Sequence, residues 1–359
     1  MTIFYVLIAV LLLGILVTVH EAGHFFAARL TGIAVTEFAI GFGPKLAGWK
    51  SKKHGTAFSI RAIPLGGFCA FVGEDDPSGR HKDDPRAFAR QKVWKRLLTV
   101  LMGPVMNFVL AFVVAALYFW IGGVGVATGI DPYVMQVAGA GPAYSAGLKD
   151  GDVITHINGV DVLDGTTDTL LNMISGYKKG DEPLHMVIRR GETTFETDMT
   201  PFWDEAEGKY RVGVTIGGVY RVEQQKISFL ESVSHSWETC VYAGGMVLRA
   251  LGDLVTTGEG LDQTSGPVGV VSLVTEQVRT GGFDAFLNLL VVISINLGVM
   301  NALPIPGLDG SRVVFLLLES VRRKPIAPEK EAMVHLAGMA FLFMVMIFFT
   351  FKDVMNLFR

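Results

Sequence analysis

Four apolar segments, each close to the length that crosses a lipid bilayer, limit this chain to few folds. They cover about residues 3–28, 97–121, 283–303 and 334–351. A hydrocarbon core of about 30 Å needs roughly 20 helical residues. Inside lipid, every backbone N–H and C=O group must find a partner within the protein, so spanning segments of this kind form helices. We therefore expect a polytopic α-helical membrane protein with four transmembrane helices.

Composition supports this expectation and excludes other classes. Half of the 359 residues are hydrophobic, only 18% are charged, and the net charge of −3 gives no reason to expect a nucleic-acid partner. The two cysteines, Cys69 and Cys240, match neither a disulfide nor a metal-binding pattern, so we expect free thiols. The first apolar segment has no basic leader and no small-residue cleavage site, which favours an uncleaved helix over a signal peptide.

The basic residues predict how the helices are oriented. Lys and Arg residues lie near the ends of the segment between the first two spans and follow the third span, and such residues mark cytoplasmic loops. They are Arg29, Lys45, Lys50, Lys52, Lys53, Arg90, Lys92, Lys95, Arg96, Arg322, Arg323 and Lys324. With four spans, both termini and the long insertion at 122–282 are then expected to be extracytoplasmic.

The sequence HEAGH at residues 20–24 places two histidines and a glutamate at the end of the first apolar segment. His20 and His24 are four residues apart, so on a helix they project from one face and can reach one zinc ion. Glu21 points off this axis, where it can take a proton from the attacking water. Two unrelated surface histidines are the alternative, but ionisable groups within an apolar span are costly and usually functional. Counted back from Arg29 at 1.5 Å per residue, His20 lies about 13 Å along the helix, within the bilayer and nearer its cytoplasmic face.

A third ligand is expected in NALPIPGLDG, residues 301–310. Pro304 and Pro306 cannot both continue a helix, so the third span must break here. Broken backbone at membrane depth is tolerated only where it is buried in protein or lines a cavity. Asp309, just beyond the break, could cap the helix that begins at Ser311. Beside an H-E-x-x-H motif in another span, the zinc-ligand interpretation is favoured.

These motifs and several others resemble the site-2 protease family of intramembrane zinc metalloproteases, in particular the bacterial branch typified by the regulator of sigma-E protease. The resemblance runs in order along nearly the whole chain, through HEAGH, GFGP (41–44), DPRAF (84–88), WKR (94–96), GPVMN (103–107), SGPVG (265–269) and NALPIPGLDG. It implies that zinc is bound by His20, His24 and Asp309 and that Glu21 is the catalytic glutamate. It further implies that substrate is bound near the zinc by Asn301, Pro304, Pro306 and Gly43.

The resemblance also implies an activity and a location. The expected reaction is hydrolysis of peptide bonds in transmembrane segments of single-span membrane proteins, in the bacterial cytoplasmic (inner) membrane, with the active site towards the cytoplasm. An anti-sigma factor already trimmed by a first protease is the family-based expectation for the substrate, and signal-peptide remnants are the alternative. A zinc-binding membrane receptor or chaperone that does not cleave its partners is a competing hypothesis, which Glu21 disfavours because metal binding alone needs no base. A metal-ion transporter is disfavoured because such proteins tend to show repeated halves, and the sequence shows none.

The insertion resembles a PDZ domain, an α+β fold, over about residues 128–220. Residues 153–157 alternate as in a strand, and Asn158–Gly159 offers a hairpin turn. A short amphipathic helix is expected around 170–174, and further strands at 186–190 and 193–199. PDZ folds bind extended peptides by strand addition at a sheet edge. A rigid cap that only blocks access is an equally good interpretation. The enterobacterial relative has two tandem PDZ modules, and this chain has room for one.

Two further segments complete the expected domain organisation. Residues 222–264 predict an amphipathic helix, interrupted at Gly244–Gly245, that lies on the outer membrane surface or braces the PDZ-like domain. The cytoplasmic loop at about 30–96 contains a stretch, 34–73, whose glycines and β-branched or aromatic residues favour short strands at the membrane face. The expected organisation is thus 1–121 with two helices and the β-rich loop, 128–220, 222–264, and 265–359 with the last two helices.

Overall fold

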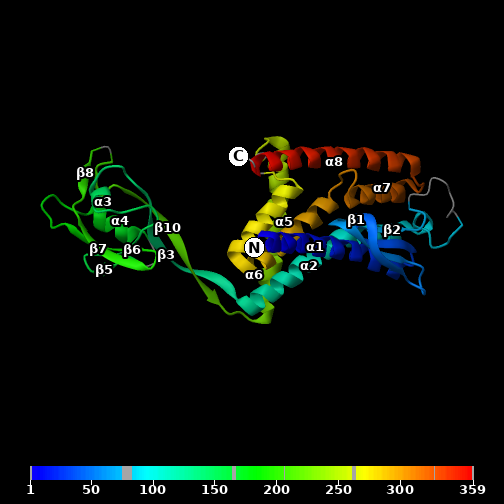
Figure 1. The fold of residues 1–359 in the computed structure, drawn as a ribbon, viewed down its shortest axis with the longest axis horizontal. Coiled ribbons are helices and arrows are strands. Elements are labelled where there is room, and N and C mark those ends of the chain that lie inside the picture. The colour runs from blue at the N-terminus through cyan, green and yellow to red at the C-terminus, as the bar shows by residue number, and fades with distance from the viewer. Residues whose placement is uncertain are drawn as a thin grey trace. The chain divides into compact units, whose positions relative to one another are not determined.

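The structure, a computed structural model, describes residues 2–74, 83–163, 167–205, 207–260, 264–326 and 328–357. The chain divides into two compact units (Figure 1). Unit 1 contains Met1–Ile121 and Ser228–Arg359, and unit 2 contains Gly122–Ile227. Each unit is described by itself.

Four helices among the described residues of unit 1 are long and apolar enough to cross a membrane. They are α1 (Thr2–Thr31), α2 (Val93–Gly122), α6 (Pro267–Ala302) and α8 (Pro328–Leu357) (Figure 1). Each contains one of the four apolar segments expected from the sequence, so the predicted helices are confirmed.

Helix α6 begins earlier than expected and is broken in the middle. The sequence predicts a span from about residue 283, whereas the helix starts at Pro267. Gly282 interrupts it with φ 61° and ψ −141°, a conformation that is open to glycine and strained for other residues. Glu276 and Arg279 form an ion pair in the part before the break, and their charges hid this part from a reading based on hydrophobicity.

Helices α1 and α2 cross at two glycines. A Cβ atom on Gly23 would collide with the backbone of Met102, and a Cβ on Gly103 would collide with the rings of His20 and His24. Small residues at a crossing let two helices approach closely, which is the usual basis of packing inside a bilayer. The two helices are therefore held close together at the position of the HEAGH motif.

The N-terminal half of α1 packs against α6. Leu12 and Leu16 are fully buried there, in a cluster with Val274 and Leu290 of α6. Asn107 of α2 is also fully buried, and its backbone oxygen accepts a hydrogen bond of 2.8 Å from Ser294 of α6. These contacts fix α1, α2 and α6 as the central group of helices in unit 1.

The stretch after α1 forms β1 (Val35–Lys50) and β2 (Ala57–Phe71), which pair with each other. Residues 37–40 of β1 pair with residues 57–60 of β2 on one side and with residues 67–70 on the other, and residues 45–50 pair with residues 57–61. Gly41, Gly43 and Gly66, which have positive φ, lie between these paired segments. Each strand is thus a succession of short paired segments, in agreement with the short strands expected from the sequence.

Helix α7 (Asp309–Arg322) follows the break after α6. Glu319 of α7 forms an ion pair with Arg96 of α2, and both side chains are largely buried. This pair fixes the direction in which α7 leaves the break, and so positions Asp309 at its start.

Helix α8 contacts both the segment after α6 and the start of α6. Gly338 lies directly against Pro306, and near the end of α8 Asp353 accepts a hydrogen bond of 2.7 Å from the backbone N–H of Gly269. Only 6% of its apolar window is buried inside the protein. Most of this helix therefore presents apolar side chains outward.

Helix α5 (Phe229–Thr256) belongs to unit 1 and runs without a break through Gly244–Gly245, where the sequence predicts an interruption. It begins with a capping box formed by Ser228 and Glu231. Cys240 packs against buried residues of α2 and α6, and Gly244 approaches Ile295 and Val299 of α6. The predicted interruption is therefore wrong: α5 is continuous there, and its Gly244 side packs against α6. Residues 261–263 of the predicted segment 222–264 lie outside the described residues.

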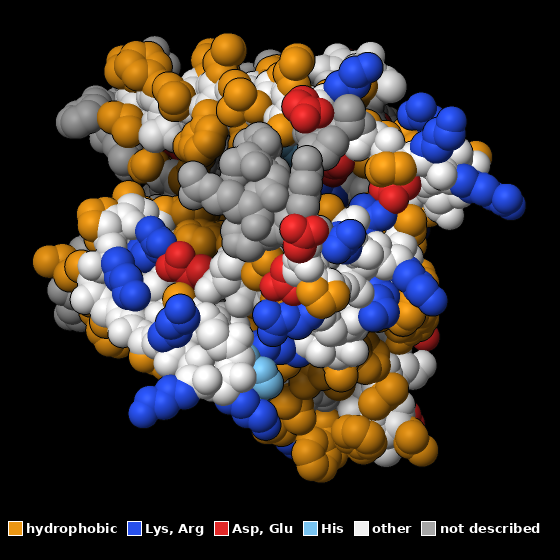
Figure 2. All heavy atoms as spheres, turned by 90° about the vertical axis from the view of Figure 1, so that its right-hand side faces the viewer, with side chains coloured by type: hydrophobic (Ala, Val, Ile, Leu, Met, Phe, Trp, Pro, Cys, Tyr) orange, Lys and Arg blue, Asp and Glu red, His pale blue; other side chains and the backbone are white. Residues whose placement is uncertain are grey.

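Lys and Arg side chains gather on one face of the molecule (Figure 2). This face includes the end of unit 1 that carries the β1–β2 hairpin and α7, opposite the end where α5 lies (Figure 1). Hydrophobic side chains surround it at the margins of the same view. Lys and Arg residues that are far apart in the sequence are therefore close together in the fold.

Unit 2 is built on a six-stranded sheet with the order β10–β3–β4–β6–β7, in which β5 pairs with β4. Strands β3 and β10 pair along their full length, from Val124 opposite Gln225 to Val137 opposite Val214. The elements are β3 (Val124–Val137), α3 (Pro142–Ser145), β4 (Val153–Ile157), β5 (Val160–Asp161), α4 (Asp168–Ser175), β6 (Leu184–Arg190), β7 (Thr193–Met199), β8 (Phe202–Asp204), β9 (Lys209–Arg211) and β10 (Val214–Gln225).

The local predictions for this region are confirmed. The predicted strands correspond to β4, β6 and β7, and the predicted short helix corresponds to α4. Asn158 and Gly159 both have positive φ, as a two-residue hairpin turn requires. The core that these elements enclose includes the fully buried residues Val134, Ile154, Leu170, Met186 and Ile188.

One buried ion pair supports this core from its edge. The Asp152 side chain is 1% exposed and receives two hydrogen bonds from Arg190, of 2.7 and 2.8 Å. Burial raises the pKa of Asp152, but the hydrogen bonds from Arg190 and from the backbone N–H of Lys149 outweigh it and hold the pKa below its usual value. The carboxylate is thus an ionised part of the fold.

Candidate metal centre

Two imidazoles project together from α1 into the interior of unit 1. His20 and His24 are 8% and 7% exposed, and their Nε2 atoms lie 3.2 Å apart. Their spacing of four residues places them one helical turn apart. Gly103 of α2 lies against both rings, and a Cβ atom at this position would collide with them. The sequence prediction that both histidines face one point is confirmed in this geometry.

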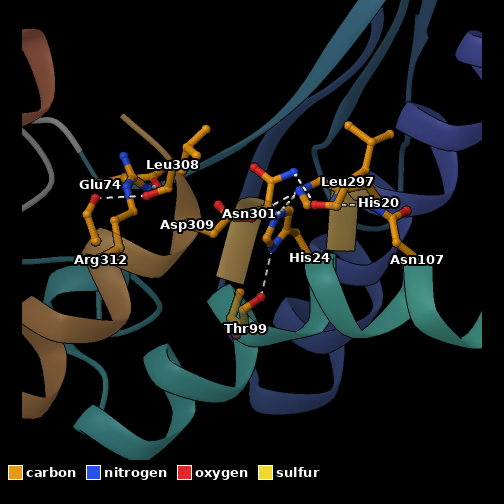
Figure 3. Close-up of polar contacts among 11 residues, drawn as sticks. His20, His24, Glu74, Thr99, Asn107, Leu297, Asn301, Leu308, Asp309 and Arg312 are labelled. Carbon is orange, nitrogen blue, oxygen red and sulfur yellow. Dashed lines mark hydrogen bonds and ion pairs between the residues drawn. The ribbon is translucent and has the colours of Figure 1, made fainter. Parts of the chain in front are cut away.

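Asp309 reaches the same point from the start of α7 (Figure 3). Its Oδ2 atom lies 3.0 Å from His20 Nε2 and 3.2 Å from His24 Nε2. These three side chains form the one group of at least three His, Cys, Asp or Glu residues within metal-binding reach among the described residues, with ligand atoms within 4.8 Å of one another. Two imidazole nitrogens and a carboxylate oxygen are the donor types of catalytic zinc sites. The residues present therefore fit a zinc ion.

Each imidazole is also contacted at its second nitrogen. His24 Nδ1 lies 2.9 Å from the backbone oxygen of Thr99, and His20 Nδ1 lies 3.2 Å from the Asn107 side chain (Figure 3). Thr99 and Asn107 both belong to α2. Sequence reasoning gave neither residue a role, although Asn107 stands within the motif GPVMN and is an amide inside an apolar span, which is the signal that could have identified it.

Glu21 lies beside the three ligand candidates in a cavity of about 540 Å³. The backbone of Cys69 in β2 hydrogen-bonds its carboxyl group, and a Cβ on Gly67 would touch its side chain. The cavity is bounded by α1, the hairpin, α2 and the segment that leads into α7, through the residues His20, Glu21, His24, Phe42, Gly67, Phe68, Cys69, Ala70, Phe71, Glu74, Val100, Asn301, Gly307, Leu308, Asp309 and Arg312. A carboxylate next to the three ligand candidates can serve as a general base.

The four residues expected to bind substrate do not all meet here. Asn301 lines the cavity, and its side chain donates a hydrogen bond of 3.0 Å to Leu297 of its own helix. Gly43 lies in β1, where its backbone oxygen accepts a hydrogen bond from Arg61. Pro304 is exposed, and Pro306 packs against Gly338 of α8. The last three are outside the residues that line the cavity.

An ion pair that the sequence did not suggest lies at the same cavity. Arg312, three residues after Asp309, pairs with Glu74, which follows β2 (Figure 3). The pair joins the start of α7 to the end of the hairpin. It therefore connects the element that carries Asp309 with the strand that lies against Glu21. The residues are 238 apart in sequence, so no local pattern could reveal their contact.

The other histidines that the structure describes are not part of this site. His54, His156, His185, His235 and His335 are absent from the cavity lining, and His81 lies outside the described residues. The two cysteines are free. Cys69 lines the cavity but is not within reach of the three ligand candidates.

Comparison with known proteins identifies a family that matches most of this chain. A family model described as peptidase family M50 matches residues 8–345. A protein of Clostridium acetobutylicum, whose name assigns it to the zinc metalloproteases, is 35% identical over 355 residues, which cover 99% of this chain and 98% of the relative. The regulator of sigma-W protease RasP of Bacillus subtilis is 30% identical, with 97% of this chain and 98% of the relative covered. Zinc metalloprotease RasP of Geobacillus kaustophilus is 31% identical, with 97% of each chain covered.

One solved structure matches a part of the chain. The PDZ domain of an SdrC-like protein from Listeria monocytogenes is 25% identical and covers 25% of this chain and 90% of its own length. The TM-score is 0.22, which supports no statement about the fold.

Proposed function

Since this chain belongs to peptidase family M50, the site-2 protease family, and is therefore a metallopeptidase of the membrane, we propose that it cleaves peptide bonds within transmembrane segments of other proteins. In this proposal His20, His24 and Asp309 hold one Zn²⁺ ion and Glu21 is the general base. The observation that carries it is the convergence of three zinc-type donors within 4.8 Å, two of them from a helix long and apolar enough to cross a membrane. Peptide bonds inside a bilayer meet almost no water, so their hydrolysis needs a protein cavity at that depth.

The chain's own residues would divide the chemistry as follows. When bound, zinc supplies a Lewis acid that makes water a nucleophile at neutral pH and polarises the scissile carbonyl. Glu21 accepts the proton of the attacking water and returns it to the leaving amide nitrogen. Its position between α1 and the β2 strand keeps the carboxyl group next to the ligand set while the peptide enters from the open side of the cavity.

A cleaved peptide must be extended, and β2 offers a place for it. Residues 67–71 of β2 line the cavity, and β2 pairs with β1 alone in its two-stranded sheet. An unwound substrate segment added to the other edge of β2 would pass beside Glu21. Next to the cavity, an apolar groove lies between α1 and the hairpin, lined by residues that include Leu11, Gly14 and Ile40. A helical part of the same substrate would fit there. Single-span membrane proteins are therefore the proposed substrates.

The proposed setting is the bacterial cytoplasmic membrane. Gathering of Lys and Arg on the end of unit 1 that carries the hairpin supports a cytoplasmic location for that end (Figure 2). Both termini and unit 2 would then be extracytoplasmic, and the zinc site would lie towards the cytoplasmic side. Because a relative is named as a regulator of sigma-W protease, an anti-sigma factor trimmed by a first protease is the proposed natural substrate, with signal-peptide remnants as the alternative.

Unit 2 is proposed to be a PDZ-like domain, with residues 128–220 as its extent, and α5 within 222–264 to lie at the outer membrane surface. A groove between α4 and the β9–β10 region, lined by Leu171, Ile174 and Ile216 among others, would accept a peptide. A cap that excludes bulky substrates is the second interpretation. Neither role places unit 2 in the proton transfers, which need heavy atoms roughly 2.6–3.2 Å apart.

The proposal is tested by separating zinc binding from cleavage. Purified protein in detergent is mixed with a single-span substrate, and bound zinc is measured in the same samples. Glu21→Gln should abolish cleavage and keep zinc near the level of the parent, because Gln has the same shape but accepts no proton. His20→Ala, His24→Ala and Asp309→Ala should lose zinc as well as cleavage. A Glu21→Gln protein without zinc would contradict the assignment of the metal ligands. Full cleavage by Glu21→Gln would show that Glu21 is not the general base.

A further inference from the structure

Asn107 is an amide in an unusual position. Asn107 lies in the middle of α2 and is 0% exposed. Its Oδ1 atom has no hydrogen-bond partner among the described residues. Its Nδ2 atom faces His20 Nδ1 at 3.2 Å. A buried polar atom without a partner costs free energy, so such an atom needs an explanation.

The neighbouring histidine shows what a zinc-binding imidazole requires here. His24 Nδ1 lies 2.9 Å from the backbone oxygen of Thr99. A carbonyl oxygen only accepts, so His24 carries a hydrogen on Nδ1, which leaves its Nε2 atom available to a metal ion beside Asp309. Zinc-binding histidines commonly donate their second N–H to an acceptor in this way, and the bond fixes both the tautomer and the ring orientation.

His20 needs the same arrangement but faces the wrong atom. If its Nε2 is to bind a metal, its Nδ1 must carry the hydrogen. Two donors would then face each other, the Nδ1–H group of His20 and the NH₂ group of Asn107, while the acceptor oxygen of the same amide has no partner. A half-turn of the amide about its last side-chain bond exchanges the two atoms without changing the space that they occupy.

We propose that Asn107 is a positioning residue for the metal centre: in the zinc-bound protein it presents Oδ1 to the Nδ1–H group of His20 and thereby directs His20 Nε2 to the ion. This inference rests on the proposed zinc site. With it, both histidines are oriented by carbonyl oxygens of one helix, the backbone oxygen of Thr99 and the side-chain oxygen of Asn107.

The surroundings keep Asn107 in place for this role. Ser294 of α6 donates a hydrogen bond of 2.8 Å to its backbone oxygen, which ties this turn of α2 to α6. Gly103, one turn earlier on α2, lies directly against both imidazoles. Because helix, ring and amide are all fixed, the amide can change which atom it presents but cannot move away.

The test compares an acceptor with an apolar side chain of the same size. Asn107→Asp keeps an oxygen at the position and offers no N–H donor, whereas Asn107→Leu offers neither. The full chain is purified in detergent, and its zinc dissociation constant is measured by competition with a chelator. The absorption spectrum of the Co²⁺-loaded protein reports the ligand geometry independently of activity. Ser236→Ala, which removes a fully buried hydroxyl of α5 that donates to the backbone oxygen of Ser232, is the control for loss of a buried polar group.

We expect Asn107→Asp and the control to bind zinc as tightly as the parent or tighter, with an unchanged Co²⁺ spectrum. Asn107→Leu should bind 10- to 100-fold more weakly, the usual effect of losing a partner of a zinc-binding histidine. Loss of affinity in Asn107→Asp, in protein that is folded by circular dichroism, would overturn the inference because it would mean that the amide N–H is required. The Asp variant decides this even if Asn107→Leu does not fold. A parent that binds zinc no better than His20→Ala would overturn the zinc site, and the inference with it.

Discussion

Gly103→Ala tests whether the close crossing of α1 and α2 is what holds the metal-binding geometry. The added Cβ would lie 2.9 Å from Cε1 of His20 and still closer to the ring of His24. Non-bonded carbon atoms are at their optimal separation at about 3.5–4.0 Å. The His20 ring, or the whole of α2, must therefore move by at least ~0.6 Å.

This movement is large compared with what a metal site allows. Zinc–ligand distances are defined to within about ±0.2 Å, so the displacement is roughly three times that tolerance. It affects both histidines at once, since both rings touch the added atom. We therefore expect zinc affinity to fall by at least 10-fold and up to about 100-fold, the range seen when a single partner of a zinc ligand is lost. By the usual conversion this is a loss of about 1.4–2.8 kcal/mol of binding free energy.

The assay is a chelator competition that gives the zinc dissociation constant of purified protein, with cleavage of a single-span substrate measured in parallel. Gly14→Ala is the matched control, because it makes the same substitution inside α1 at a position where an added Cβ meets nothing within 4 Å. It should leave zinc affinity unchanged. The reasoning is refuted if Gly103→Ala and Gly14→Ala bind zinc equally tightly.

Three further predictions follow from other parts of the structure. In a protein lacking Cys69 and Cys240, cysteines at Lys52 and Arg323 should resist a membrane-impermeant thiol reagent in intact cells while one at Lys178 reacts; the opposite labelling would reverse the proposed orientation. Asp152→Ala should destabilise unit 2 by about 1–3 kcal/mol, which is less than the 3–5 kcal/mol of a fully buried pair because Arg190 is 37% exposed. Since the pKa of Asp152 is lowered in the fold, the parent should lose this stability as the pH falls below about 4. A stability difference between the two proteins that does not change with pH in denaturant titrations would contradict this. Replacing residues 128–220 by a short flexible joint should preserve zinc binding and cleavage of a short substrate, and should allow cleavage of a full-length substrate that the parent spares; a folded, zinc-loaded variant that cuts neither would favour peptide docking by unit 2 over gating.

The parts of the fold that follow from short-range patterns could be predicted. The four helices follow from the length of apolar segments, and the joint projection of His20 and His24 follows from their spacing on one helix. In unit 2, Asn158–Gly159 identified a hairpin turn because only residues that tolerate positive φ fit there. The break after α6 was predicted from two prolines, and Asp309 beyond it indeed lies against both histidines.

The parts that were missed depend on contacts between distant segments. Asn107 contacts His20 across 87 residues, and nothing in the sequence says which face of α2 meets α1. The need for glycine at positions 23 and 103 arises only from the contact between α1 and α2, which no local pattern shows. The early start of α6 was hidden by Glu276 and Arg279, which satisfy each other. The pairing of β1 with β2 could not be predicted because residues 37–40 pair with two different segments of β2, which neither strand alone reveals.

The pairing of Val124 with Gln225 has a consequence for how this chain can be altered by evolution or by engineering. The chain enters and leaves unit 2 through two neighbouring strands, so the rest of the protein is connected as if a tight hairpin joined Gly122 to Ser228. The entropy of closing a loop grows only slowly with its length, and here the paired strands have already closed it. Residues of unit 2 beyond the paired strands β3 and β10 can therefore be inserted, deleted or replaced without altering the connection between α2 and α5. A foreign sensor domain with adjacent termini, grafted at the same strands, should fold independently and give the peptidase a new regulatory input.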